Sequence, residues 1–399
     1  MKKILLLGGL RYLLPVIEAA HQQGYYVITA DYLPNNFAHQ CADEYINVSI
    51  IDKEAVLKEA QKRNIDGIIS FAVDPGVVTA AYVQEKMHLP AFGPYESVKI
   101  MQNKDLFRQF LNDNGFNVPQ AKGYGSLEEV MNDAKNWNYP VIVKPTDSAG
   151  SKGVKRVDCE SELRSAAENT FENALKGKII IEDFIEPEGC TSDSDSFSVD
   201  GEMKFITFSA QRFDKNASNP YTPSAYSWPS TFTEEQQEYL KSELQRLVSL
   251  LKMKTTVYNI ETRIGKDGKA YIMEVSPRGG GNRLSEMVKH STGVDFITAA
   301  VRAAVGDPVN IQPAPLNGHW AEVILHADKT GVFKELKFFD SISNGNIRKV
   351  DLWVHSGDSV TAFNGANNAI GTLVLKFDTN EELEKVLSNQ DKYFQVVVE

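Results

Sequence analysis

Two glutamates flank a short turn sequence in the second half of the chain. Glu261 and Glu274 lie in strand-like segments on either side of Gly-Lys-Asp-Gly-Lys (265–269). Asp-Gly is a favoured pair for a two-residue type I′ hairpin turn. If Asp267 and Gly268 form that turn, Glu261 and Glu274 become direct neighbours on one face, with Cβ atoms about 4.5–5.5 Å apart.

Like charges at that separation destabilise a hairpin unless a cation lies between them. Mg²⁺ or Mn²⁺ suits the position, because hard dications bind carboxylates together with phosphate oxygens. Ser276 shares the face of Glu274, since strand side chains repeat every two residues, and it is a third candidate ligand. The alternative is a solvated face on which Glu261 pairs with Arg263 or a lysine.

A lysine stands at the end of a second apolar strand. The run Val-Ile-Val-Lys-Pro (141–145) is followed by Thr-Asp-Ser-Ala-Gly-Ser-Lys-Gly (146–153). Lys144 and the small-residue loop could place an ammonium group and backbone N–H groups around phosphates. The loop lacks the GxxxxGK[ST] pattern, which disfavours a P-loop NTPase. Taken alone the signal is weak, because strand-terminal lysines are usually solvated.

A third strand, over residues 178–182, ends in Glu182 and Asp183 and continues into Phe184 and Ile185. Such a segment resembles a hinge between two lobes. The Glu182 carboxylate could accept from an adenine amino group while the following backbone reads the ring edge. A strand merely capped by acids is the alternative.

The elements that position these residues begin with a parallel sheet. Strands expected at 3–7, 25–31 and 67–71 alternate with helices at 12–23 and 53–63, which is typical of βαβ winding. Gly8-Gly9 follows the first strand, but GxGxxG is absent, so an NAD-linked oxidoreductase is not favoured.

Beyond residue 100 the pattern changes. Helices are expected at 104–114, 161–175, 234–251 and 381–387, and strands at 139–144, 178–182, near 320–327, 349–355 and 371–377, with alternation at 197–208 and a hairpin over 257–275. Residues 211–233 show no periodicity and are expected to form a long lid or binding loop.

The composition excludes several classes. With 42 basic and 53 acidic residues, the net charge of -11 argues against a nucleic-acid partner. No apolar run approaches the roughly 18–20 residues of a membrane span. Three separated cysteines form no CxxC pair, so neither a disulfide framework nor a zinc site is expected, and a cytoplasmic protein fits.

These residues in this order resemble the ATP-grasp superfamily, which includes biotin carboxylase and carbamoyl-phosphate synthetase. The resemblance spans nearly the whole chain and implies an α/β and α+β fold. A Rossmann-like pre-ATP-grasp domain is expected over 1–100 and a two-lobed ATP-grasp domain over 101–310, with a small lobe at about 115–185. A small mixed lobe would follow over 311–399.

The resemblance also implies roles for individual residues. Phosphate contacts fall to Lys104 and Lys144, and the phosphate flap to Ser148, Gly150, Ser151 and Gly153. Adenine contacts fall to Glu182, Asp183, Phe184 and Ile185, ribose contacts to Glu188 or Glu186, and metal ligation to Glu261, Glu274 and Ser276. Asn is usual at the position of Ser276, which leaves the number of metal ions open.

Two arginines complete the expected site. Arg278 would face the acyl phosphate, and Arg283 would bind a carboxylate substrate or its phosphate, because bidentate geometry favours arginine. An ordinary salt bridge is the equal alternative for Arg283.

The expected function is therefore an ATP- and Mg²⁺-dependent (or Mn²⁺-dependent) C–N ligase acting on a small-molecule carboxylate and an amine. A bicarbonate-using carboxylase or purine-pathway ligase is the first alternative, and a non-catalytic ATP-binding protein is the second. A homodimer is expected, and neither substrate can be named.

Overall fold

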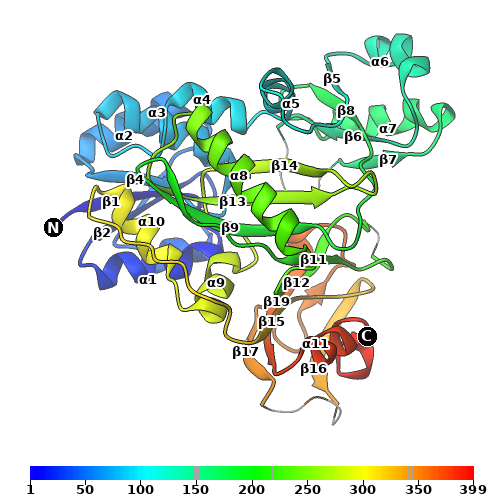
Figure 1. Ribbon diagram of the computed structural model, residues 1–399. Coiled ribbons are helices and arrows are strands. Elements are labelled where there is room, and N and C mark those ends of the chain that lie inside the picture. Colours follow the sequence, from blue (N-terminus) through cyan, green and yellow to red (C-terminus); the bar gives the residue numbers. More distant parts are fainter. Residues whose placement is uncertain (148–152, 218, 340–341, 343–344) are drawn as a thin grey trace.

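The computed structural model describes residues 1–147, 153–217, 219–339, 342 and 345–399. The described strands form five sheets (Figure 1). The first is parallel, in the order β3-β2-β1-β4, and comprises β1 (Lys3–Leu7), β2 (Tyr26–Asp31), β3 (Glu44–Asn47) and β4 (Gly67–Ser70). The predicted parallel sheet is confirmed.

Five helices belong to this part of the chain, and their ends follow from capping residues. They are α1 (Leu14–Gln22), α2 (Lys53–Arg63), α3 (Asp74–Met87), α4 (Tyr95–Met101) and α5 (Lys104–Asp113). Of these, α1 and α3 pack directly on the sheet. The side chains of Asp52 and Asn103 accept from the first turns of α2 and α5, which fixes where these helices begin. Short 3₁₀ turns lie at Arg11–Leu13, Phe37–Gln40, Ala134–Asn136, Ala366–Asn368 and Gln390–Lys392.

A small lobe projects from the molecule (Figure 1). Its antiparallel sheet has the order β5-β8-β6-β7, from β5 (Ala121–Tyr124), β6 (Val141–Pro145), β7 (Lys155–Val157) and β8 (Ile179–Asp183). Helices α6 (Leu127–Asp133) and α7 (Glu160–Glu172) pack on it. Val141, Val143, Leu163 and Ile181 belong to a hydrophobic cluster of the lobe's own.

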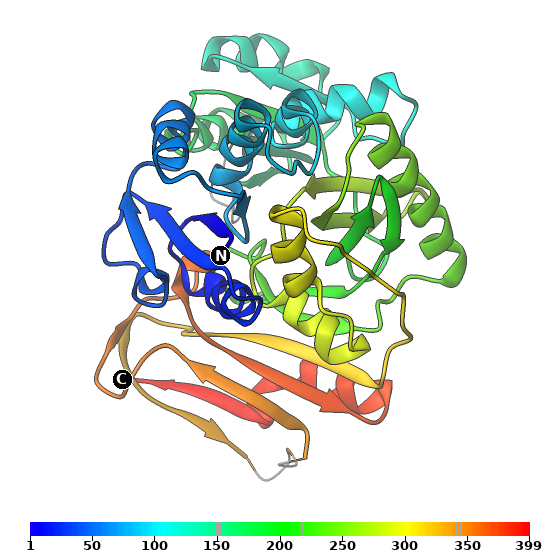
Figure 2. The same ribbon diagram turned by 90° about the vertical axis from the view of Figure 1, so that its left-hand side faces the viewer.

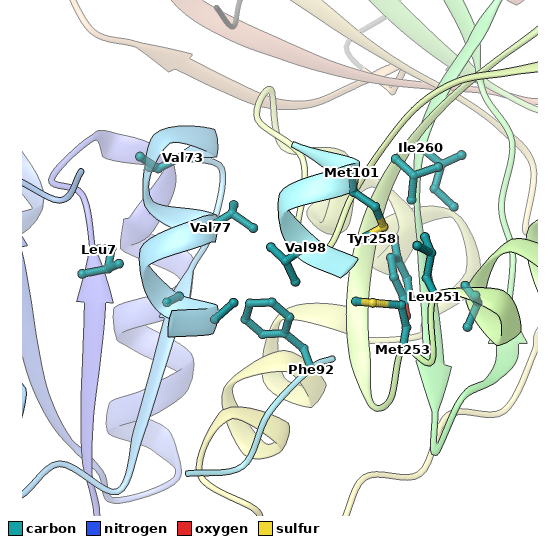
Figure 3. Packing of buried hydrophobic residues seen from close by; sticks show 14 of the residues in the cluster. Leu7, Val73, Val77, Phe92, Val98, Met101, Leu251, Met253, Tyr258 and Ile260 are labelled. Atoms are coloured by element: carbon teal, nitrogen blue, oxygen red, sulfur yellow. The ribbon is translucent and has the colours of Figure 1, made fainter. Parts of the chain in front are cut away.

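The central sheet has the antiparallel order β10-β9-β13-β14. It comprises β9 (Ser192–Val199), β10 (Glu202–Phe205), β13 (Thr256–Ile264) and β14 (Ala270–Ser276), with α8 (Glu234–Leu250) packed against it. Its core continues into the first domain, where Phe92 and Val98 belong to the same cluster as Met253 and Tyr258 (Figure 3). This shared core holds the central sheet against α3 and α4.

The C-terminal part contains two further sheets. The larger has the order β11-β12-β15-β19-β17, from β11 (Ala210–Phe213), β12 (Pro223–Trp228), β15 (His319–His326), β17 (Ile347–Leu352) and β19 (Ala369–Phe377). The smaller comprises β16 (Gly331–Phe338), β18 (Ser359–Val360) and β20 (Phe394–Val398), and α11 (Asn380–Leu387) packs on the larger one.

The expectation of an aperiodic loop over 211–233 is wrong, because β11 and β12 lie within it and join the C-terminal sheet. Two of its prolines, Pro223 and Pro229, stand at the start of β12 and just beyond its end. At strand ends a missing N–H does not interrupt the ladder. Residues from the expected ATP-grasp range thus build part of the sheet completed by residues 319–377.

Helices α9 (Leu284–Thr292) and α10 (Phe296–Ala304) return to the first domain. Figure 2 shows α10 in yellow beside the blue α1, and residues of both helices share a core cluster. The fold class, a parallel N-terminal sheet followed by antiparallel sheets, is as predicted. Among the described residues, no helix combines the length and apolarity that crossing a membrane requires.

Candidate active site

The central hairpin pairs Glu261 with Glu274, as predicted, but by another route. Next to the turn Ile264 pairs with Ala270, so the connection is one residue longer than a type I′ turn. Gly268 adopts φ +76° and donates to the Gly265 carbonyl at 2.8 Å. A register shift between Glu261 and Thr262 removes the one-residue offset. The predicted turn type is wrong, and a bulge restores the predicted pairing.

Arg108 of α5 anchors this bulge. The register leaves Met273 as the extra residue of β14, and its carbonyl accepts from Arg108 Nη1 at 2.8 Å. Arg108 Nε also donates to Glu182 Oε2 at 2.9 Å, and the arginine side chain is only 3% exposed. A single buried guanidinium therefore connects the hairpin to the end of β8 in the small lobe.

Two rows of polar side chains cross the central sheet. Asp193, Glu261 and Glu274 are direct neighbours on β9, β13 and β14. The second row comprises Asp195, Asn259 and Ser276. Each of these residues is two positions from a member of the first row on the same strand, so both rows lie on the same face of the sheet. Sequence reasoning missed both aspartates, although the alternation Ser-Asp-Ser-Asp-Ser (192–196) was the available signal.

The acidic row carries uncompensated negative charge. Burial and the neighbouring Glu274 carboxylate raise the pKa of Glu261, and the cations of Lys104, Lys144 and Arg263 only partly oppose this. Burial and the charge of Glu261 likewise raise the pKa of Asp193 well above its usual range. A dication would favour the ionised form of both acids, so this set of oxygen donors fits Mg²⁺.

Two lysines lie beside the acidic row. Lys104, the first residue of α5, places its Nζ 3.3 Å from Glu274 Oε2. Burial by itself lowers the pKa of Lys104, but Glu274, Asp74 and Glu261 outweigh it and raise the pKa. Lys144 lies on β6, and its positive charge acts to lower the pKa of Glu261. The structure therefore brings the predicted metal and phosphate residues together.

The side chain of Glu182 lies between two cations. One oxygen accepts from Arg108 and the other from Lys144, and the carboxylate is buried. These contacts orient Lys144, and the contact of Glu182 with an adenine amino group stays a prediction. The following backbone is engaged as well, since the Asp183 and Phe184 N–H groups donate to Gln120 and Pro140.

Arg278 lies at the end of the second row and is held by the first domain. Its Nε and Nη2 donate to the carboxylate of Asp74 at 2.8 and 2.7 Å, and Nη1 donates to Asn259 Oδ1 at 2.9 Å. Asp74 begins α3 and was not foreseen from the sequence. Burial raises the pKa of Asp74, yet the Arg278 cation outweighs burial and keeps the pKa low.

The hydroxyl of Ser276 belongs to the same network. It donates to Asp74 Oδ1 at 3.0 Å and accepts from Gln102 Nε2 at 2.8 Å. These contacts direct the hydroxyl toward the first domain, and metal ligation by Ser276 stays a prediction. Within the first row, Asp193 is the third oxygen donor beside Glu261 and Glu274.

Arg283 connects the loop after β14 to the C-terminal sheet. It donates to both oxygens of Glu286 at 2.8 and 3.0 Å and to Thr372 Oγ1 at 2.7 Å, and it pairs with Asp351. Its side chain is 9% exposed. The structure therefore shows the salt bridges of the alternative for Arg283, and a contact of Arg283 with a substrate stays a prediction.

The remaining predicted residues lie further from these contacts. Glu188 is exposed, and its N–H donates to the Ile264 carbonyl at 2.8 Å. Gly153 adopts φ +71°, and its carbonyl accepts from Thr170. The other predicted flap residues, Ser148, Gly150 and Ser151, fall outside the described residues.

Comparison with known proteins finds a known domain in the middle of the chain. The ATP-grasp domain profile matches residues 137–286. The large chain of carbamoyl phosphate synthase from Clostridium perfringens (strain SM101 / Type A) is 25% identical over 260 residues, which cover 64% of this chain and 24% of that one. This chain therefore spans about a quarter of the length of that relative.

Solved structures match over the full length. The L-amino acid ligase from Bacillus licheniformis aligns with a TM-score of 0.83 and 20% identity, covering 100% of this chain and 99% of that one. The phosphoribosylglycinamide synthetase from Anaerococcus prevotii aligns with a TM-score of 0.78 and 21% identity, covering 100% of both chains.

A biotin carboxylase domain shares the fold as well. It belongs to the 2-oxoglutarate carboxylase of Hydrogenobacter thermophilus and was solved with MgADP, ADP and bicarbonate. It aligns with a TM-score of 0.74 and 18% identity, covering 100% of this chain and 91% of that one. Residues 137–286 form an ATP-grasp domain, and the chain is related to the carbamoyl phosphate synthase large chains.

Proposed function

We propose that this protein is an ATP- and Mg²⁺-dependent, ADP-forming ligase that activates a carboxylate as an acyl phosphate for attack by an amine. The observation that carries the proposal is the row Asp193–Glu261–Glu274 with Lys104 and Lys144 beside it. Phosphoryl transfer depends on positioning and charge stabilisation, which carboxylates for a dication and lysines for phosphates supply.

Each residue would have a defined role. Glu261 and Glu274 would hold Mg²⁺, which when bound neutralises charge on the nucleotide phosphates. Lys104 and Lys144 would contact the phosphates, and Glu182 would keep Lys144 directed toward them. Arg278, immobilised by Asp74, would present its cation to the carboxylate that receives the phosphoryl group.

The arrangement of the lobes suits a water-sensitive intermediate. An acyl phosphate hydrolyses unless water is excluded until the amine attacks. The small lobe has its own hydrophobic core, so it could close over the acidic row as a rigid unit.

A bicarbonate-using reaction is the second candidate. The fold is shared with a biotin carboxylase domain that was solved with bicarbonate, as well as with an amino acid ligase. Bicarbonate would take the place of the carboxylate that receives the phosphoryl group, so the acidic row and the two lysines would serve either reaction.

A screen of ADP release tests the proposal. The protein would be incubated with Mg-ATP and pairs of amino acids, hydroxy acids, simple amines or bicarbonate, with mass spectrometry of the products. We expect ADP release that requires both a carboxylate and an amine, together with an amide product. A carboxylated product would establish the second candidate. ATP binding without ADP release for any pair would establish a non-catalytic nucleotide-binding protein.

A further inference from the structure

Glu322 of β15 is a buried acidic residue in the larger C-terminal sheet. Its exposed fraction is 0%, and among the described residues neither carboxylate oxygen has a hydrogen-bond partner. Apolar side chains of Trp228, Leu284, Trp320 and Ile324 form a cluster over this part of the sheet. Burial raises the pKa of Glu322 well above its usual range. An unpartnered buried carboxylate is costly, so a ligand is a natural reason for keeping one.

The strand register directs Glu322 toward the acidic row. Glu322 lies directly opposite Tyr226 of β12, and directly paired residues of antiparallel strands point to the same face. The Tyr226 hydroxyl donates to Asp193 Oδ2 at 3.2 Å. Glu322 therefore projects from the C-terminal sheet on the side from which Tyr226 reaches Asp193.

Polar groups from two other elements meet Tyr226. The side-chain amide of Asn282 donates to the Tyr226 hydroxyl at 3.4 Å, and the Tyr12 hydroxyl donates to Asn282 Oδ1 at 3.2 Å. This hydrogen-bond chain runs from the first domain to the acidic row. The charge of Glu322 also contributes to raising the pKa of Tyr12, after burial, so Tyr12 lies within electrostatic reach of Glu322.

The charges that act on Glu322 are those of Arg283, Glu286 and Asp193. Arg283 donates to Glu286 and Thr372 and pairs with Asp351, and no hydrogen bond joins it to Glu322 in the part of the chain that the structure describes. The Arg283 cation exerts the largest of the three charge effects and lowers the pKa of Glu322, whereas Glu286 and Asp193 raise it. Burial and the two acids outweigh Arg283, so a cation that carries N–H donors fits this position better than an anion does.

We propose that Glu322 binds the ammonium group of the second substrate and thereby selects amines that are protonated in free solution. This inference rests on the proposed ligase function and narrows it to primary amines, including amino acids. The Glu322 carboxylate accepts hydrogen bonds from the ammonium group and takes up one of its protons, which leaves Glu322 neutral. The neutral amine then attacks the acyl phosphate, and the new C–N bond replaces the C–O bond to the departing phosphate. Glu322 is thus a specificity-determining residue.

Methylammonium binding to the whole protein tests this inference without requiring turnover. Thermal denaturation would be followed in methylammonium chloride, in tetramethylammonium chloride and in sodium chloride at equal ionic strength. We expect methylammonium to raise the melting temperature of the wild type, and tetramethylammonium, which has no N–H donor, to leave it at the sodium value. An equal effect of the two organic cations would overturn the proposal.

The near-isosteric variant Glu322→Gln supplies the second measurement. We expect it to melt no lower than the wild type without ligand and to lose the methylammonium shift. Its KM for the amine should rise at least tenfold, while its KM for ATP stays within twofold. An unchanged KM for the amine would refute the role of Glu322 even in an active ligase. If Glu322→Gln fails to fold, the comparison of the two cations on the wild type decides.

The two proposals can fail separately. A methylammonium shift without ADP release for any substrate pair would uphold the ammonium site and refute the ligase. ADP release that requires an amine, without dependence on Glu322, would uphold the ligase and refute the site.

Discussion

Arg278 and Asp74 form a two-point ion pair that ties the loop after β14 to the first turn of α3. Arg278 is buried and Asp74 is partly exposed, and the pair lies beside Ser276 at the end of the second polar row. The domain without predicted nucleotide residues thus fixes the arginine that we propose to face the reacting carboxylate.

Asp74→Ala is expected to destabilise the protein strongly. It leaves the Arg278 guanidinium buried without its carboxylate, a loss that typically costs about 3–5 kcal/mol. Urea denaturation would measure the free energy of unfolding. Glu96→Gln is the matched control, because it removes an exposed pair with Lys99, worth roughly 0–1 kcal/mol. Equal effects of the two variants would contradict the structural role of Asp74.

Removing a charge from the acidic row is expected to stabilise the free protein and to weaken its binding of Mg-ATP. In the absence of Mg-ATP, Glu261→Gln should raise the free energy of unfolding by about 1 kcal/mol, since it relieves a buried like-charge contact. The same variant should lose the stabilisation that Mg-ATP gives to the wild type. Calorimetry with and without Mg-ATP measures both effects, and full retention of the Mg-ATP shift would count against metal binding here.

Glu274→Gln should abolish ATP turnover while the fold stays intact. The amide cannot supply the negative charge that a dication needs, and Lys104 loses its ion-pair partner. ADP release and circular dichroism would report activity and folding. Near-normal consumption of Mg-ATP by this variant would refute the metal assignment.

The pH dependence of stability should carry a signature of Glu182. Burial raises the pKa of this carboxyl, but the cations of Arg108 and Lys144 outweigh burial and lower it to about 2, from an ordinary 4.5. Because the folded pKa lies below the unfolded one, the ionised group stabilises the fold above pH 4.5. This contribution is lost as the pH falls toward 2.

Comparing the wild type with Glu182→Gln isolates that contribution. The difference in the free energy of unfolding should stay constant near neutral pH and shrink below pH 4.5. Denaturant titrations at a series of pH values would measure it. A difference that grows on acidification would show that the ion pair is not formed as described.

The close approach of Gly279 to Phe71 gives a prediction about packing. A Cβ atom at Gly279 would lie 2.1 Å from Phe71 Cζ, so Gly279→Ala should cost about 1–3 kcal/mol. Phe71→Leu in the same chain would vacate that space. A double-mutant cycle of urea denaturation should give a favourable coupling between the two substitutions. Strict additivity would show that the loop moves aside without strain.

The sequence predicted the elements whose signals are local. Capping residues such as Asp52 and Asn103 place the starts of α2 and α5 at the predicted residues 53 and 104. The pairing of Glu261 with Glu274 was also predicted. It is formed only because the longer turn and the bulge at Met273 shift the register by one residue in opposite directions. The bulge at Met273 could not be foreseen, because it is held by Arg108 from a distant helix.

Long-range pairing accounts for most of what the sequence did not reveal. β12 consists of Pro223–Trp228 and lies between two prolines, which made the segment resemble a loop until its partner β15 was known. Asp193 lies in a strand of serines and aspartates that has no apolar alternation. The partners of Glu182 and Arg283 come from elements far along the chain, and no local pattern predicts them.

β11 and β12 are strands of the larger C-terminal sheet, so the chain cannot be cut between them and the rest of that sheet without exposing a sheet edge. Four residues of β12 pair with β15, so a fragment that stops before residue 319 leaves the buried Tyr226 and Trp228 on an open sheet edge. Such a fragment would be prone to aggregate, although the matched profile ends at residue 286. Grafting the nucleotide-binding lobes onto another protein therefore requires transferring the last eighty or so residues with them.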